Sequence, residues 1–185
     1  YDSKLLIDEA HAFGVMGSAG RGESFELKEP ISIISGTFGK AFGSGGAFLA
    51  TDKITGKNLI QNCGAFRYTT ALAPPLCASA LAALNLIESN PNWGSELKEK
   101  SKALRDRLSQ VGWQRPAGEG PIISIILGSD RLAMDYQKRL EAQGLLTVAI
   151  RPPTVPEGKS RLRLVIRRNT PDQAFERLIE ILKNK

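Results

Sequence analysis

The chain has 185 residues, which suits one domain or two small ones, and 42% of them are hydrophobic, enough for a core. Its net charge of +6 favours anionic partners, but only 6% of the residues are aromatic. With no basic helix or aromatic platform, a phosphorylated small ligand is favoured and no nucleic acid is expected. No apolar run has the length of a membrane span, and the start lacks the regions of a signal peptide, so we expect a cytoplasmic protein without a membrane partner.

Two cysteines, Cys63 and Cys77, and one histidine are too few for a disulfide framework or a metal centre. We therefore expect reduced thiols and no metal site. The chain begins with Tyr1 and Asp2 rather than methionine, and it enters an apolar segment at once. We expect it to be part of a longer protein.

Residues 4–8, KLLID, predict a short buried strand that brings Asp8 and His11 to the carboxyl edge of a sheet. Ligands bind at this edge in open α/β folds. An aspartate there can keep a heterocyclic nitrogen protonated, and a histidine can hydrogen-bond an oxygen or stack on a ring. Taken singly, Asp8 also fits a turn, and His11 fits an interior position with its hydrogen bonds satisfied.

Residues 31–35, ISIIS, predict a second strand, buried on both faces and followed by a glycine-rich loop that contains Lys40. Lys40 then lies just past the carboxyl end of a strand, at the same edge as Asp8. Glycine allows a backbone to approach a ligand closely. The loop region contains Gly36, Gly39, Gly43, Gly45 and Gly46.

We expect Lys40 to be shielded from water by Phe38, Phe42 and Phe48, which makes its amine available as a nucleophile toward a carbonyl. A phosphate-binding nucleotide loop is excluded because Gly36 is too close to Gly39 and Lys40 is followed by alanine. A dinucleotide-binding glycine motif is absent as well. A solvated surface lysine stays open as the alternative.

The next segments predict a helix over residues 52–61, an extended segment over 66–72 that the prolines at 74 and 75 stop, and a helix over 76–89. Thr69 and Thr70 can offer hydroxyls to a phosphate, although threonine is also common in strands for its β-propensity.

From Trp93 the pattern alternates charged amphipathic helices with strands, which predicts a small α+β unit. We expect helices over 95–111, 129–143 and 170–183, and strands over 121–127, 145–150 and 160–167. The connection IRPPTVPEG at residues 150–158 is stiffened by three prolines, so it can hold Arg151 in place to bind a carboxylate with two hydrogen bonds. An ordinary surface charge is the alternative for Arg151. Arg161 and Arg163 are expected on the wet face of the last strand.

Four stretches resemble one family in its chain order, the α-oxoamine synthases, which are fold-type I enzymes that depend on pyridoxal phosphate. They are DEAHAFGVMGSAGRG at 8–22, GTFGKAFGSGG at 36–46, YTTALAPP at 68–75 and IRPPTVPEGKSRLR at 150–163. The resemblance implies an α/β fold. Residues 1–92 would belong to the cofactor-binding large domain with its mostly parallel sheet, and residues 93–185 would form the small α+β domain.

The resemblance also implies the roles of individual residues. Lys40 would bind the cofactor covalently and move the proton of the bound amino acid. Asp8 would pair with the pyridine nitrogen and His11 with the phenolic oxygen of the cofactor. The remaining implied contacts are the cofactor phosphate for Thr37, the phosphate of a neighbouring subunit's cofactor for Thr69 or Thr70, and the amino-acid substrate for Arg151 and Thr154.

The implied reaction is the decarboxylative condensation of L-alanine with a pimeloyl thioester, carried by coenzyme A or an acyl carrier protein, in a homodimer with a shared active site. Two alternatives stay open. One is a glycine-using member of the family such as 2-amino-3-ketobutyrate ligase, against which the stretch IRPPTVPEG argues. The other is a non-catalytic fragment or scaffold.

Members of the family are about twice as long as this chain, and their N-terminal half supplies a glycine-rich phosphate loop and a histidine that stacks on the cofactor ring. We therefore expect the longer parent to be the enzyme. Residues 1–185 alone are expected to be inactive or poorly folded, because the strands at 4–8 and 31–35 would lack neighbours.

Overall fold

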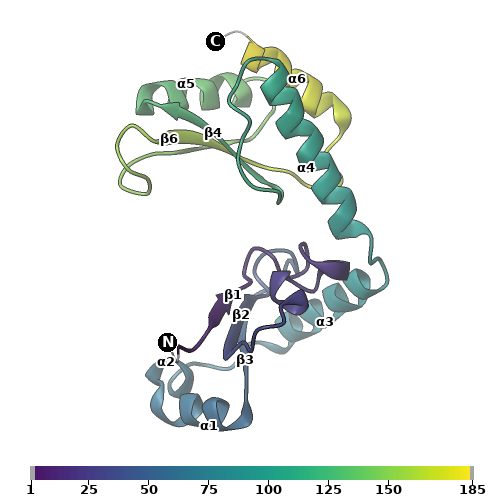
Figure 1. The fold of residues 1–185 in the computed structure, drawn as a ribbon, viewed down its shortest axis with the longest axis vertical. Coiled ribbons are helices and arrows are strands. Elements are labelled where there is room, and N and C mark those ends of the chain that lie inside the picture. Colours follow the sequence, from purple (N-terminus) through teal and green to yellow (C-terminus); the bar gives the residue numbers. More distant parts are fainter. Residues whose placement is uncertain (1–2, 184–185) are drawn as a thin grey trace. The chain divides into compact units, whose positions relative to one another are not determined.

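Three strands form a small mixed sheet in the order β1-β2-β3 in the first part of the chain (Figure 1). The structure is a computed structural model and describes residues 3–183. β1 (Leu6–Asp8) runs parallel to β2 (Ile33–Thr37), with Asp8 opposite Ser35. β3 (Ala47–Thr51) runs antiparallel to β2. The carboxyl ends of β1 and β2 therefore meet at one edge, as the sequence predicted.

The predicted burial of the first two strands is wrong. Leu6 in β1 is 59% exposed, and β2 is half-buried except at Gly36. The reason is that β1 is an edge strand of a three-stranded sheet, so its apolar side chains are not enclosed by the described residues. The strand β3 was not predicted, and it turns the lysine-containing segment into the loop of a hairpin.

Two short 3₁₀ turns and three helices complete this part. The turns are η1 (Ser18–Gly20) and η2 (Glu23–Glu26), and the helices are α1 (Lys53–Asn62), α2 (Gly64–Arg67) and α3 (Pro74–Glu88). Asp52 caps α1 by accepting hydrogen bonds from the backbone N–H groups of Ile54 and Thr55.

The extended segment predicted for residues 66–72 is partly wrong, because Phe66 and Arg67 end α2. Pro74 and Pro75 begin α3 rather than only stopping a strand. Proline is well tolerated in the first turn of a helix, where its missing N–H would have no intrahelical partner.

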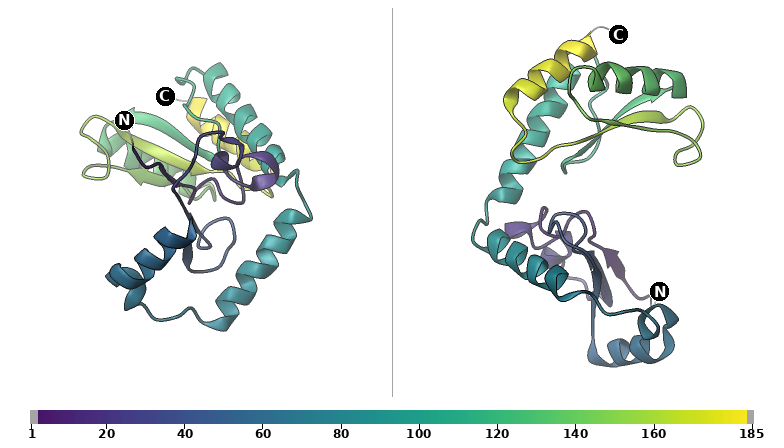
Figure 2. Two further views of the ribbon diagram at one scale, coloured as in Figure 1. Left: turned by 60° about the horizontal axis from the view of Figure 1, so that its bottom comes forward. Right: turned by 180° about the vertical axis from the view of Figure 1, so that it is seen from behind.

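The second part of the chain is an antiparallel sheet with helices on one face. β4 (Ile122–Gly128), β6 (Ser160–Val165) and β5 (Val148–Ile150) pair in the order β4-β6-β5. The helices are α4 (Trp93–Gln110), α5 (Asp130–Glu141) and α6 (Asp172–Lys183), and Figure 2 shows all three beside the sheet. The α/β class and this small α+β layer agree with the sequence prediction.

The chain divides into two compact units, residues 1–95 and 96–185. The division follows shortly after the predicted boundary between residues 92 and 93. The membership of the first unit in a larger cofactor-binding domain stays a prediction. Within residues 3–183, no helix combines the length and the apolar character needed to cross a membrane.

The core of the second unit reflects the way in which successive side chains of β6 alternate between the two faces of the sheet. Leu162 and Leu164 are buried, whereas Arg161 and Arg163 between them are half-buried on the opposite face. The buried face of the sheet packs against one apolar stripe on each helix. The buried cluster contains Leu104, Leu108, Ile123, Ile125, Tyr136, Leu140, Leu162, Leu164, Ile166, Phe175, Leu178, Ile179 and Leu182.

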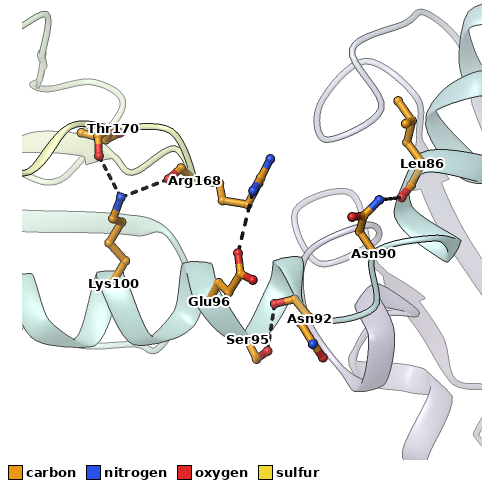
Figure 3. A network of polar contacts seen from close by, with 8 residues as sticks. All are labelled: Leu86, Asn90, Asn92, Ser95, Glu96, Lys100, Arg168 and Thr170. Atoms are coloured by element: carbon orange, nitrogen blue, oxygen red, sulfur yellow. Dashed lines mark hydrogen bonds and ion pairs between the residues drawn. The ribbon is translucent and has the colours of Figure 1, made fainter.

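Polar contacts tie the start of α4 to the segment that follows β6 (Figure 3). The Lys100 ammonium donates to the carbonyl oxygens of Arg168 and Thr170, at 3.0 and 2.8 Å. Glu96 and Arg168 form a longer ion pair of 3.9 Å. These contacts hold the entrance to α6 against α4 within the second unit.

We expect Leu108→Ala to lower the free energy of unfolding by about 2–5 kcal/mol, because it leaves a cavity in this core. Leu108 has no exposed surface. The matched control is Leu146→Ala, because Leu146 is 88% exposed and its truncation should change stability by less than about 0.5 kcal/mol. Urea denaturation followed by tryptophan fluorescence measures both, since Trp113 packs on Tyr136 inside the unit. Equal effects of the two substitutions would contradict the described core.

Candidate active site

The shared edge of β1 and β2 collects the polar groups of the candidate site. Asp8 ends β1, and its Oδ1 accepts a hydrogen bond of 2.8 Å from the backbone N–H of Ala10. The Ser35 side chain, opposite Asp8 on β2, also hydrogen-bonds the carboxylate. The turn after β1 and the neighbouring strand β2 therefore both act on one carboxylate group.

These contacts lower the pKa of Asp8 below its ordinary value of 3.8. The largest cause is the N–H of Ala10, followed by the Ser35 side chain, while the partial loss of contact with water opposes them. The charges of Lys40 and His11 lower the pKa further. Asp8 is therefore ionised at neutral pH.

The loop of residues 38–46, between β2 and β3, carries Lys40 and is closed by its own hydrogen bonds. The backbone N–H of Phe38 donates to Gly46 O at 2.9 Å, and that of Ser44 donates to Phe38 O at 2.8 Å. The Thr37 hydroxyl donates to Gly46 O and accepts from the N–H of Gly39, both at 3.1 Å. Gly46 has a φ of +97°, and a Cβ there would overlap Leu72, so glycine is required.

Lys40 is exposed, so the predicted shielding of its side chain by phenylalanines is wrong in the described structure. The rings instead pack on one another behind the loop. Phe42 stacks on Phe13 with ring centroids 5.0 Å apart, and Phe48 packs edge-on to Phe13 at 5.2 Å. Phe38 joins the cluster through both Phe42 and Phe48. The cluster supports the loop from one side and leaves the amine accessible.

A cavity of about 280 Å³ lies beside Asp8 at this edge. Its volume is near the lower end of small-ligand pockets, and it combines apolar walls with a few polar groups. It is lined by Asp8, Ala10, Ser35, Gly36, Thr37, Ala47, Phe48, Leu49 and Phe66. A Cβ at Gly36 would overlap the Phe48 ring, so glycine permits the close approach of β2 to this wall.

These residues fit the ring portion of pyridoxal phosphate. An ionised carboxylate at the pocket wall can hold a proton on a pyridine nitrogen, and apolar side chains can flank an aromatic ring. The described residues offer fewer hydrogen-bond donors to the phosphate group of the cofactor, because the Thr37 hydroxyl already donates to Gly46 O. Among the described residues, no group of three or more His, Cys, Asp or Glu side chains could hold a metal ion.

Glu9 is a residue of this region that the sequence did not single out. Only 2% of its surface is exposed, and its carboxylate accepts hydrogen bonds from the backbone N–H groups of Glu23 and Ser24. It thereby fastens the glycine-rich turns to the segment between Asp8 and His11. The sequence around Glu9 does not indicate this role, because the hydrogen-bond partners of Glu9 are backbone groups about 15 residues away.

The other predicted site residues lie in two places. Thr69 and Thr70 are exposed, between α2 and α3 in the first unit. Arg151 and Thr154 belong to the second unit, where the N–H of Thr154 donates to Arg151 O at 3.0 Å in the turn that follows β5. The charges of His11 and Lys40 thus act on Asp8 at the edge of the first sheet, while Arg151 and Thr154 share an exposed turn of the second unit.

We expect carboxyl-carbon NMR to find a pKa for Asp8 below 3.8, and Ser35→Ala to raise it, because one hydrogen bond to the carboxylate is lost. A folded-state pKa below the unfolded value means that Asp8 contributes stability above the unfolded value. That contribution is lost as the pH falls through the folded-state pKa.

The internal control for this titration is Asp52, whose pKa is lowered chiefly by the side chain and backbone of Thr55. Ser35→Ala should leave the pKa of Asp52 unchanged. An Asp8 pKa at or above 3.8 would contradict the described contacts.

Comparison with known proteins places this site in a family. Residues 1–182 match the aminotransferase class I and II family. The 8-amino-7-oxononanoate synthase of Methylobacillus flagellatus is 39% identical over 184 residues, which cover 98% of this chain and 46% of that protein. The chain spans about half the length of the curated relatives it matches.

Solved structures have the same fold. A crystal structure of 8-amino-7-oxononanoate synthase from Francisella tularensis matches with a TM-score of 0.85 and 28% identity, over 97% of this chain and 54% of that chain. A serine palmitoyltransferase solved with pyridoxal phosphate matches with a TM-score of 0.89 over 98% of this chain and 47% of that one. At 24% identity, this second likeness shows the fold alone. The matches confirm the resemblance found in the sequence, and the chain belongs to the aminotransferase class I and II family.

Proposed function

We propose that this chain is the C-terminal half of a pyridoxal-phosphate-dependent acyltransferase, an 8-amino-7-oxononanoate synthase of biotin biosynthesis. The observation that carries the proposal is that Asp8 lines a small pocket at the sheet edge where the segments with His11 and Lys40 leave their strands, and that both charges act on its carboxylate. The names of the curated relatives support the same reaction. The substrates would be L-alanine and a pimeloyl thioester.

In this proposal the cofactor supplies an electron sink for the negative charge that develops at the α-carbon of the amino acid. Asp8 holds the proton on the pyridine nitrogen, which requires an ionised carboxylate, and the lowered pKa supports this role. His11 hydrogen-bonds the phenolic oxygen. The two residues are three positions apart, because Asp8 ends β1 and His11 lies in the turn that follows.

Lys40 holds the cofactor and moves the proton of the amino acid at its α-carbon. Its amine is exposed, on a loop that is closed by hydrogen bonds and supported by phenylalanine rings. The alternative of a solvated surface lysine makes no use of the neighbouring carboxylate.

The remaining contacts follow from the family resemblance. Thr37 would contact the phosphate group, which requires its hydroxyl to give up the hydrogen bond to Gly46 O. Thr69 or Thr70 would reach the cofactor of a second subunit, which makes the active site shared in a homodimer. Arg151 binds the carboxylate of alanine with two hydrogen bonds, and Thr154 lies in the same turn. Either coenzyme A or an acyl carrier protein, both anionic, suits the net charge of +6. A cytoplasmic location stays part of the proposal.

We expect Lys40→Ala in the full-length protein to lower the turnover of product by roughly 10²–10⁴-fold or more, because the residue both holds the cofactor and transfers a proton. Borohydride reduction of the wild-type protein loaded with pyridoxal phosphate should leave a pyridoxyl group on Lys40, found by peptide mass mapping. Lys57→Ala is the matched control for turnover and labelling and should change neither, since Lys57 is an exposed lysine of α1. A pyridoxyl group elsewhere, or none, would exclude the proposed role.

Product formation from alanine and from glycine distinguishes the synthase from glycine-using relatives. With pimeloyl-CoA as the second substrate, we expect a higher kcat/KM for L-alanine than for glycine and release of carbon dioxide. Preference for glycine without carbon dioxide release would favour the ligase alternative. A protein that carries the pyridoxyl group but turns over neither amino acid would favour a scaffold.

A further inference from the structure

The loop that carries Arg151 is tied down at both ends. This Arg–Pro loop, residues 151–159, connects β5 to β6. Within it, Thr154 N–H donates to Arg151 O at 3.0 Å and Lys159 N–H donates to Pro156 O at 3.1 Å. These two turns shape the loop, but neither bond reaches the rest of the unit, so its placement depends on what holds its two ends.

Helix α5 holds the end that enters β6. The Ser160 hydroxyl donates to Oδ1 of Asp130, the first residue of α5. Ser160 has no exposed surface, whereas Asp130 is exposed. The loop and the start of the helix also line one cavity of about 490 Å³, formed by Gly128, Ser129, Asp130, Pro152, Glu157 and Gly158.

The same helix holds the end that leaves β5. Oε1 of Gln137 accepts a hydrogen bond of 2.8 Å from the backbone N–H of Ala149, two residues before Arg151. Asp130 and Gln137 are seven residues apart, which is close to two helical turns, so they lie on the same side of α5. One helix face therefore contacts both strands that carry the loop.

We propose that Asp130, Gln137 and Ser160 are positioning residues for the substrate carboxylate, because α5 fixes through them the direction in which the loop presents Arg151. The inference rests on the proposed function, in which Arg151 binds the amino acid. A guanidinium group must match a carboxylate in plane and distance to form two hydrogen bonds. If the hydrogen bond at either end of the loop is removed, the Arg151 guanidinium keeps its charge but loses its alignment with the carboxylate.

This role differs from simple stabilisation of the second unit in what it affects. A structural contact would change the melting temperature and the amount of active enzyme, but neither KM value. A positioning contact raises the KM of the amino acid and leaves the KM of the thioester unchanged. Displacement of a substrate-binding group by about 1 Å can cost as much as 10²-fold.

The test uses full-length holoenzyme with L-alanine and pimeloyl-CoA. We expect Ser160→Ala and Asp130→Ala each to raise the KM of alanine about tenfold, with the KM of pimeloyl-CoA within twofold of wild type. Asp130→Asn should restore the wild-type KM, since its amide oxygen still accepts from the Ser160 hydroxyl. Asp135→Ala is the matched control, an exposed acid on the same helix that should change neither KM.

Gln137→Leu tests the other end of the loop and should give the same split between the two KM values. It also keeps the proposal testable should Ser160→Ala fail to fold. Unchanged KM values for alanine in folded Ser160→Ala or Gln137→Leu enzyme would overturn the inference.

Arg151→Lys shows whether unchanged KM values in these variants contradict only the positioning role or also the proposed role of Arg151. If Arg151→Lys raises the KM of alanine and the α5 variants do not, only the positioning role is wrong. If Arg151→Lys has no effect, Arg151 does not bind the amino acid, and both the assigned role and the inference fail.

Discussion

The parallel pairing of β1 with β2 is the constraint on which the candidate site depends. It places Asp8 opposite Ser35, and both strands end at the same edge of the sheet. The Ser35 side chain can then hydrogen-bond a carboxylate that lies 27 positions earlier in the sequence. A shift of one residue in this pairing would turn the strand's side chains to the other face and separate the two groups.

The loop with Lys40 depends on a second, antiparallel pairing. β3 returns beside β2, so the nine residues between them are held at both ends, and hydrogen bonds from Phe38 and Ser44 close the loop internally. The phenylalanine cluster reaches this loop from the segment after β1, through Phe13. Strand pairing and ring packing together hold the loop that carries the lysine at the same sheet edge as Asp8.

The sequence predicted the parts of the site that depend on local order, and it failed where distant residues decide. Asp8 ends a strand, and His11 and Lys40 each come three residues after a strand end, so their common edge could be foreseen. The burial of β1 could not, because it depends on how many strands flank it. Glu9 was overlooked because its partners are backbone groups that a composition pattern does not mark. The strand after Gly46 could have been found from its apolar and β-branched residues, AFLAT.

The causes of the lowered Asp8 pKa bear on how the site would work. The two largest are hydrogen bonds from Ala10 and Ser35, and the charges of Lys40 and His11 come after them. The lowering of the pKa therefore comes mainly from neutral donors that do not change during a reaction. Lys40 can lose its positive charge when it reacts, and Asp8 still stays ionised at neutral pH. A site that uses one group as nucleophile and another as a permanent anion requires this independence.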